Sequence, residues 1–204
     1  MSKMIDSIVD SNLIDEALEE NDSELLNHIG ADYYNEGDYK KAKIYYELAS
    51  AMGNDIAMSN LGYIYMYGRD VPVDYTIATA YFKISAEKGN IEAIYKLGNL
   101  YQSGKGVEKN IDLAIEYYVK ALSLIKENNI NELEYPSVYF TLAKEMLPKG
   151  SKDTNLKLAY KYMQIAIEGY KHLIELQNAN YYSKVLSEAE KILQDTIFDE
   201  FRNE

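Results

Sequence analysis

Small, apolar and aromatic side chains recur along this chain with a period of 36 residues. Two consecutive segments, 57–89 and 93–125, carry them in the same order. The paired positions, each 36 residues apart, are Leu61 and Leu97, Gly62 and Gly98, Tyr65 and Tyr101, Gly68 and Gly104, Val71 and Val107, Ala78 and Ala114, and Tyr81 and Tyr117. A fixed period of about 20 to 50 residues is typical of a solenoid, in which each repeat packs on its neighbours. The pattern therefore predicts stacked repeats.

Within each copy, the apolar residues fall at helical spacing on both sides of a glycine-containing turn. This spacing predicts helices over about residues 56–67 and 75–88 in the first copy, and a second pair over 91–126. Asp74 and Asn110 stand where the second helix of each pair begins, and both residue types are good N-caps. Each repeat is therefore predicted to be an antiparallel helix pair.

The same pattern extends, less regularly, on both sides of the duplicated stretch. In the unit before it, Gly30 and Ala42 are 12 residues apart, whereas Gly62 and Ala78 are 16 apart, so the turn is four residues shorter. After it, the polar insertion 127–135 precedes a degenerate unit that starts at Pro136. The predicted organisation is an acidic N-terminal capping segment, four repeats, and a C-terminal extension with a capping helix at about 181–201: residues 1–22, 23–54, 55–90, 91–126, 136–170 and 171–204.

The glycines inside the predicted helices require a packing reason. A helical glycine costs about 1 kcal/mol relative to alanine, so glycines kept in register imply close contact between the two helices of a pair. We expect the small residues to bring the helices together: Gly30, Gly62, Gly98 and Ala143 on the first helices, Ala42, Ala78, Ala114 and Ala159 on the second. The overall fold is predicted to be an all-α solenoid of about four such pairs.

Charge and composition limit the function. The net charge is −12, and residues 1–24 supply −7 of it through eight acids and one lysine. Such a balance argues against binding a nucleic-acid backbone, which needs clustered Lys and Arg. There is no cysteine, and neither a signal-peptide pattern nor about 20 consecutive apolar residues is found. We therefore expect a cytoplasmic protein without membrane insertion; its oligomeric state stays open.

No constellation for catalysis or for holding a cofactor or metal stands out. His28 and His172 are the two histidines, and neither has a partner at the spacing that would bring two metal ligands together on a helix. The Gly104-Lys105-Gly106 sequence lacks the flanking residues of a phosphate-binding loop, and we interpret it as a turn. The sequence predicts a protein that is not an enzyme and has no cofactor.

The motif Ala-x3-Leu-Gly-x2-Tyr-x2-Gly-x-Gly-Val, followed by a helix with Ala-x2-Tyr, resembles the Sel1-like repeat, a longer-turn relative of the tetratricopeptide repeat. Residues 93–121 match it best. Residues 57–89 match with Asp70 in place of the second turn glycine, and Asp tolerates left-handed backbone angles better than most residues. The resemblance implies an α-solenoid that binds proteins or peptides on its concave face.

Mapping the family's concave face onto the first helices predicts a partner-binding surface across the first three repeats. This surface is rich in Tyr and Asn, and we expect it to lack the Lys and Arg that would favour a carboxylate ligand. For Tyr34, Tyr63, Tyr67 and Tyr95, helical phase alone leaves groove and core equally open. The predicted partner-binding residues are Asn27, Tyr34, Ser59, Tyr63, Met66, Tyr67, Tyr95, Asn99 and Gln102.

Two hypotheses about function follow. The first is a non-catalytic interaction scaffold, or adaptor, that holds a peptide or partner protein in the concave groove. The alternative is an inhibitor or immunity-type protein that occludes a basic or enzymatic partner with its acidic surface. Whether residues 1–22 act as a cap or as a binding element stays open between the two. Steep salt dependence of binding would favour the alternative.

Overall fold

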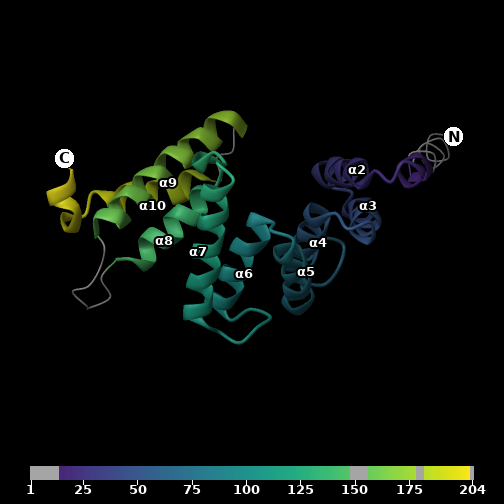
Figure 1. Cartoon of the computed structure of the whole chain (residues 1–204), viewed down its shortest axis with the longest axis horizontal. Coiled ribbons are helices and arrows are strands. Elements are labelled where there is room, and N and C mark those ends of the chain that lie inside the picture. The colour runs from purple at the N-terminus through teal and green to yellow at the C-terminus, as the bar shows by residue number, and fades with distance from the viewer. Residues whose placement is uncertain (1–13, 148–155, 178–181, 203–204) are drawn as a thin grey trace. The chain divides into compact units, whose positions relative to one another are not determined.

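The computed structural model describes residues 14–147, 156–177 and 182–202, which are helical apart from short turns and contain no strand. Residues 14–19 form a short helical segment ahead of the named elements. Figure 1 shows the remaining helices as successive antiparallel neighbours within each part of the chain. They are α2 (Ser23–Glu36), α3 (Tyr39–Ala51), α4 (Asp55–Tyr67), α5 (Tyr75–Glu87), α6 (Ile91–Ser103), α7 (Ile111–Glu127), η1 (Glu132–Glu134), α8 (Pro136–Glu145), α9 (Leu156–Gln177), α10 (Ser183–Leu193) and η3 (Thr196–Phe201).

The chain divides into two compact units, residues 1–110 and 111–204. In the first unit, α2 packs on α3, α4 on α5, and α5 on α6. In the second unit, α7 packs on α8, α8 on α9, and α9 on α10. The two helices of the third predicted repeat, α6 and α7, fall in different units. The all-α solenoid of helix pairs predicted from the sequence is confirmed.

Two helical glycines of the first unit, Gly30 and Gly62, admit an aromatic ring from the second helix of their pair. A methyl group placed on Gly62 would lie 2.7 Å from the ring of Phe82, and one on Gly30 would lie 2.7 Å from the ring of Tyr46. Phe82 is fully buried and Tyr46 is 3% exposed, so neither ring has space into which to move. The glycines therefore serve the close helix contact that their spacing predicted, and the groups that require them are these two rings.

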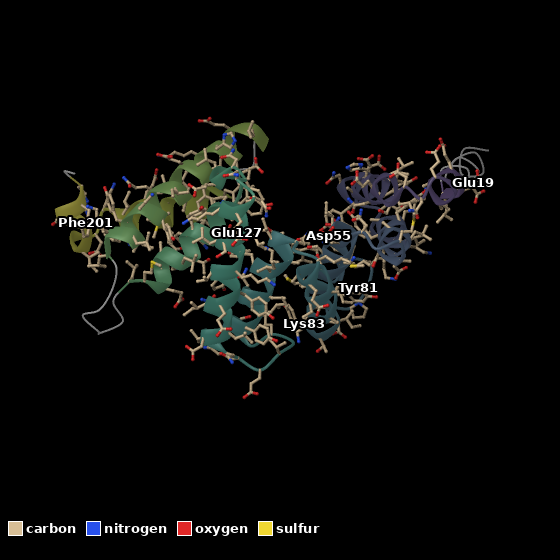
Figure 2. All side chains as sticks on the ribbon, in the orientation of Figure 1. Glu19, Asp55, Tyr81, Lys83, Glu127 and Phe201 are labelled. Carbon is tan, nitrogen blue, oxygen red and sulfur yellow. The ribbon has the colours of Figure 1, made fainter. Side chains whose placement is uncertain are left out.

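The first helices α4 and α6 each begin at a side-chain cap that also joins consecutive repeats. Asn54 Oδ1 accepts a hydrogen bond from Ala57 N, and Asn90 Oδ1 accepts one from Ala93 N. The amide groups reach back one repeat: Asn54 Nδ2 donates to the Ser23 carbonyl and Asn90 Nδ2 to Asp55 Oδ2, at 3.4 and 2.9 Å. Asp55 is labelled in Figure 2. One side chain at this position thus stabilises both a helix end and the stacking of repeats.

The cap predicted at Asp74 is confirmed. Asp74 Oδ1 accepts hydrogen bonds from Thr76 N and Ile77 N at the start of α5, as predicted. The cap of α2 is Asp22 rather than Ser23, because Asp22 Oδ1 accepts a hydrogen bond from Leu25 N. The carboxylate of Asp22 reaches the exposed N–H groups of the first turn, and Ser23 is already the first helical residue.

Left-handed residues form the turn between the helices of a long-turn repeat. Gly68 and Gly104 end α4 and α6 with φ of 65° and 72°. Asp70 takes φ of 57° where the next copy has Gly106 with φ of 70°. The expectation that Asp70 preserves the turn is therefore confirmed.

Aromatic contacts link the helices of the first unit beyond its buried core. Tyr65 on α4 stacks on Tyr81 on α5, with ring centroids 5.8 Å apart. Lys83 Nζ lies 5.9 Å from the ring centroid of Tyr101, which joins α5 to α6. Tyr81 and Lys83 are labelled in Figure 2. Tyr65 and Tyr101, expected to pack between helices, are half-buried.

The described part of the N-terminal segment packs onto the first repeat. Ala17 is fully buried in one hydrophobic cluster with Leu26, Tyr45 and Leu61, and Ile14 lies against that cluster. Residues 1–13 of the predicted acidic capping segment lie outside the described residues.

The C-terminal end differs from the single helix predicted over about 181–201. The helix α10 ends at Leu193, and Asp195 Oδ1 then accepts a hydrogen bond from Ile197 N to start the separate 3₁₀ helix η3. The prediction of one continuous helix is wrong because Asp195 offers the backbone a local cap in place of the next helical turn. As a result Phe198 is fully buried, with its ring centroid 5.4 Å from that of Tyr160.

Candidate partner-binding groove

Two neighbouring pockets open on the first unit. The small pocket, of about 110 Å³, is lined by Tyr34, Tyr46, Asn60 and Tyr63 from α2, α3 and α4. The large pocket, of about 260 Å³, is lined by residues of α4, α5, α6 and the turn that follows: Met66, Tyr67, Tyr75, Lys96, Asn99, Leu100, Ser103 and Lys105. We call the two pockets together the tyrosine groove.

Tyr63 lines the small pocket and is fixed on three sides. Its ring meets Phe82 edge-on with centroids 5.4 Å apart, and it stacks on Tyr67 at 5.8 Å. Its hydroxyl donates a hydrogen bond of 2.5 Å to Glu92 Oε1. Burial, followed by the negative charge of Glu92, raises the pKa of Tyr63 far above its usual range. Tyr63 therefore forms a rigid, neutral wall of the groove.

Lys96 places a positive charge beside this wall. Its Nζ lies 3.2 Å from Glu92 Oε1, and 5.2 and 5.3 Å from the ring centroids of Tyr63 and Tyr95. Burial alone would lower the pKa of Lys96, but the charge of Glu92 and the neighbouring tyrosines outweigh that effect and raise it. Lys96 is therefore a charged wall of the large pocket that is already balanced by one carboxylate.

The more accessible surfaces of the groove are Tyr67 and Lys105. Tyr67 is 53% exposed although its ring stacks on Tyr63. Lys105 is exposed, and its Nζ lies 5.1 Å from the ring centroid of Tyr75. Within residues 14–147, 156–177 and 182–202, no carboxylate pairs with Lys105. The groove thus presents the exposed ring of Tyr67 and the ammonium group of Lys105, which has no carboxylate partner among the described residues.

The structure brings five of the nine predicted binding residues into this groove: Tyr34, Tyr63, Met66, Tyr67 and Asn99. Tyr95 and Gln102 are half-buried on α6 and line neither pocket. The ring of Tyr95 nevertheless lies close to the ammonium group of Lys96.

Two predicted residues offer almost no surface. Asn27 is 7% and Ser59 is 3% exposed, so the expectation that they face a partner is wrong. Asn27 is covered because Asn60 of the next first helix donates a hydrogen bond of 3.0 Å to Asn27 Oδ1. Ser59 is the residue that precedes Asn60 in the same helix, on its buried side. Helical phase gave their position on the helix but not the cover supplied by neighbouring elements.

Sequence reasoning missed the cations of the groove. The expectation that this surface lacks Lys and Arg is corrected by Lys96 and Lys105 in the large pocket. Lys96 precedes Asn99 by three residues and shares its helix face, a signal that was present in the sequence. Lys105 had no such signal, because its position depends on how the turn after α6 folds back over α5.

A larger cavity of about 620 Å³ lies in the second unit between α9 and η3, lined by Lys157, Leu158, Tyr160, Lys161, Gln164, Phe201 and Arg202. It contains none of the residues predicted from the repeat pattern, and Arg202 there is held by the carbonyls of Leu193 and Asp195. This cavity is distinct from the tyrosine groove.

Among the described residues, no group of three or more His, Asp or Glu could hold a metal ion. No described helix is long and apolar enough to cross a membrane.

Stacked helix pairs with an open aromatic groove define an α-solenoid of the kind whose repeats serve as interaction surfaces. The Sel1 repeat family model matches residues 27–54, 55–90, 91–124 and 142–169, and the chain belongs to that family. Sel1-repeat proteins generally mediate protein–protein interactions. A search of curated proteins gave no significant match.

Two solved structures share this fold. A Sel1 repeat protein from Oxalobacter formigenes is 24% identical with a TM-score of 0.59, over 70% of this chain and 55% of that one. A protective antigen present in uropathogenic Escherichia coli strains, displaying an SLR fold, is 17% identical with a TM-score of 0.52, over 89% of this chain and 48% of that one. The chain thus spans about half the length of each, and at this identity the likeness concerns the fold alone.

Proposed function

We propose that this chain is a non-catalytic interaction module that binds an extended peptide segment of a partner protein in the tyrosine groove. The observation that carries the proposal is Tyr67, a large aromatic side chain that lines the large pocket and is 53% exposed. Exposed aromatic residues beside pockets are the usual anchors of protein interfaces, because they bury much apolar area at a small cost in conformational entropy.

The rigidity of the surrounding wall supports this proposal. Phe82 and Glu92 hold Tyr63 in place, and Tyr63 in turn stacks on Tyr67. A groove whose side chains are already ordered loses little entropy when a ligand binds. The pockets of about 110 and 260 Å³ each have room for a single side chain rather than for a folded domain edge. An extended segment with two inserted side chains fits this arrangement best.

Replacing Tyr67 by Ala is expected to abolish most of the binding while leaving the fold intact. Peptides selected on the full chain from a random display library provide the probe, and their affinity is measured by fluorescence anisotropy. We expect the Y67A substitution to weaken binding about tenfold or more, the loss typical of a central aromatic anchor. Substituting Tyr63 would be a poorer test, because its ring also packs on Phe82.

The matched control is Ile84→Ala, which removes an exposed apolar side chain from α5 outside both pockets. This variant should bind like the wild type. Thermal melting followed by circular dichroism confirms that each variant is folded. Selection of no peptide, or equal affinity of the Tyr67→Ala variant and the wild type, would contradict the proposed groove.

A further inference from the structure

The two pockets differ in chemistry in a way that specifies the ligand. The small pocket is walled by the rings of Tyr34, Tyr46 and Tyr63, and the one amide there, Asn60 Nδ2, is already bonded to Asn27. Its volume of about 110 Å³ suits a short aliphatic side chain. Ring faces favour such a group because both surfaces lose contact with water on binding.

The large pocket carries positive charge on two of its walls. Lys96 is balanced by Glu92 at 3.2 Å, whereas no described carboxylate pairs with Lys105. Of the two lysines that line the pocket, Lys105 is thus the one without a carboxylate partner among the described residues, on a chain whose net charge is −12. A single anionic group on the ligand would complement this charge, and it would be drawn there against the repulsion of the rest of the chain.

The positions of the lining residues along α4 bear on the spacing of the two ligand groups. Tyr63 lines the small pocket, and Met66 and Tyr67, three and four residues later on α4, line the large one. Three to four helical residues correspond to a rise of about 5 to 6 Å. In an extended peptide, side chains on the same face are two residues and about 6.6 Å apart. The pockets therefore match positions i and i+2 of an extended ligand.

We infer that the tyrosine groove recognises an extended segment in which an aliphatic side chain lies two residues from a glutamate or aspartate. The aliphatic side chain enters the small tyrosine-lined pocket, and the carboxylate lies beside Lys105 over the large pocket. Lys96 and its partner Glu92 form a fixed polar wall there and are not separated by binding. This inference rests on the proposed peptide-binding function and adds to it the chemical class of the ligand.

The test begins with the peptides selected on the full chain. We expect them to share an acidic residue two positions from an aliphatic one. Replacing that Glu by Gln in a synthetic peptide should weaken binding about three- to tenfold, the range for a partly exposed ion pair in a binding site. Lys105→Gln should produce a similar loss with the original peptide and little further loss with the Gln peptide, because both changes remove the same interaction.

Charge reversal supplies the positive arm of the test. A peptide carrying Lys in place of Glu should bind Lys105→Glu better than it binds the wild type. The control Lys88→Gln changes the net charge by the same amount as Lys105→Gln, at an exposed residue outside both pockets, and should leave all affinities unchanged. Selected peptides that depend on Tyr67 but show no acidic preference, or Glu→Gln losses equal in the wild type and Lys105→Gln, would overturn the inference while the proposed function stands. Binding that does not depend on Tyr67 would overturn both.

Discussion

Leucine in place of Gly62 is expected to unfold the first unit of the chain. A methyl group at this position already lies 2.7 to 2.9 Å from three carbons of the Phe82 ring, and leucine adds three further carbons in the same direction. Phe82 is fully buried, so it cannot swing into solvent to make room. Overpacking a tight core costs about 1 to 3 kcal/mol and occasionally more. Here the two helices must separate, and the expected loss is at the upper end or beyond.

The measurement is urea unfolding followed by circular dichroism, with the wild type and the variant compared at equal concentration. Since natural domains are stable by only about 5 to 15 kcal/mol, the loss should appear as a large fall in the unfolding midpoint or as absence of a folded baseline. Ile56→Leu is the control, because it places leucine on the same helix α4 at a residue that is 50% exposed. A cooperative transition of Gly62→Leu at the wild-type midpoint would contradict the packing of α4 on α5.

Alanine in place of Gly106 should cause the second large loss. Gly106 has φ of 70°, a conformation that costs an alanine about 1 kcal/mol. Its added methyl group would also lie 2.3 Å from the carbonyl oxygen of Tyr75, a backbone atom that cannot rotate away. Relief of the contact requires the turn after α6 to move off α5. We therefore expect a loss of several kcal/mol in the free energy of unfolding, of the size seen for overpacked sites.

The repeat itself provides a matched comparison for this variant. Asp70 occupies the equivalent turn position 36 residues earlier with φ of 57° and already carries a side chain. Asp70→Ala should therefore cost only about 1 kcal/mol, the difference in tolerance of left-handed backbone angles. Gly106→Ala should also weaken peptide binding, because Lys105 belongs to the same turn. Equal destabilisation by the two substitutions would show that the contact with Tyr75 is unimportant.

Most of the fold could be predicted from the sequence because each repeat contains the turn and cap residues that begin and end its helices. The end of α4 at Gly68 and the start of α5 after Asp74 follow directly from turn and cap residues that act locally. The break between α10 and η3 was not predicted. The apolar stripe continues through it in helical register, so the spacing of apolar residues did not reveal the local cap at Asp195.

The candidate site was less predictable, for a physical reason. The concave face of the family, mapped onto α4 by spacing along that helix, included Tyr63, Met66 and Tyr67. The burial of Asn27 depends on a residue 33 positions away, Asn60, which packs across from the next repeat. The sequence of a single repeat does not show how neighbouring helices bury its residues.

Nuclear magnetic resonance of the full chain tests directly whether a peptide binds in the tyrosine groove. Backbone amide signals are followed while a selected peptide is added to the ¹⁵N-labelled protein. If the peptide binds in the tyrosine groove, the largest chemical-shift changes fall in residues 63–67 and 96–105. Residues 156–177, some of which line the cavity of the second unit, should change little. Changes concentrated in residues 156–177, or on the acidic segment 14–24, would contradict it.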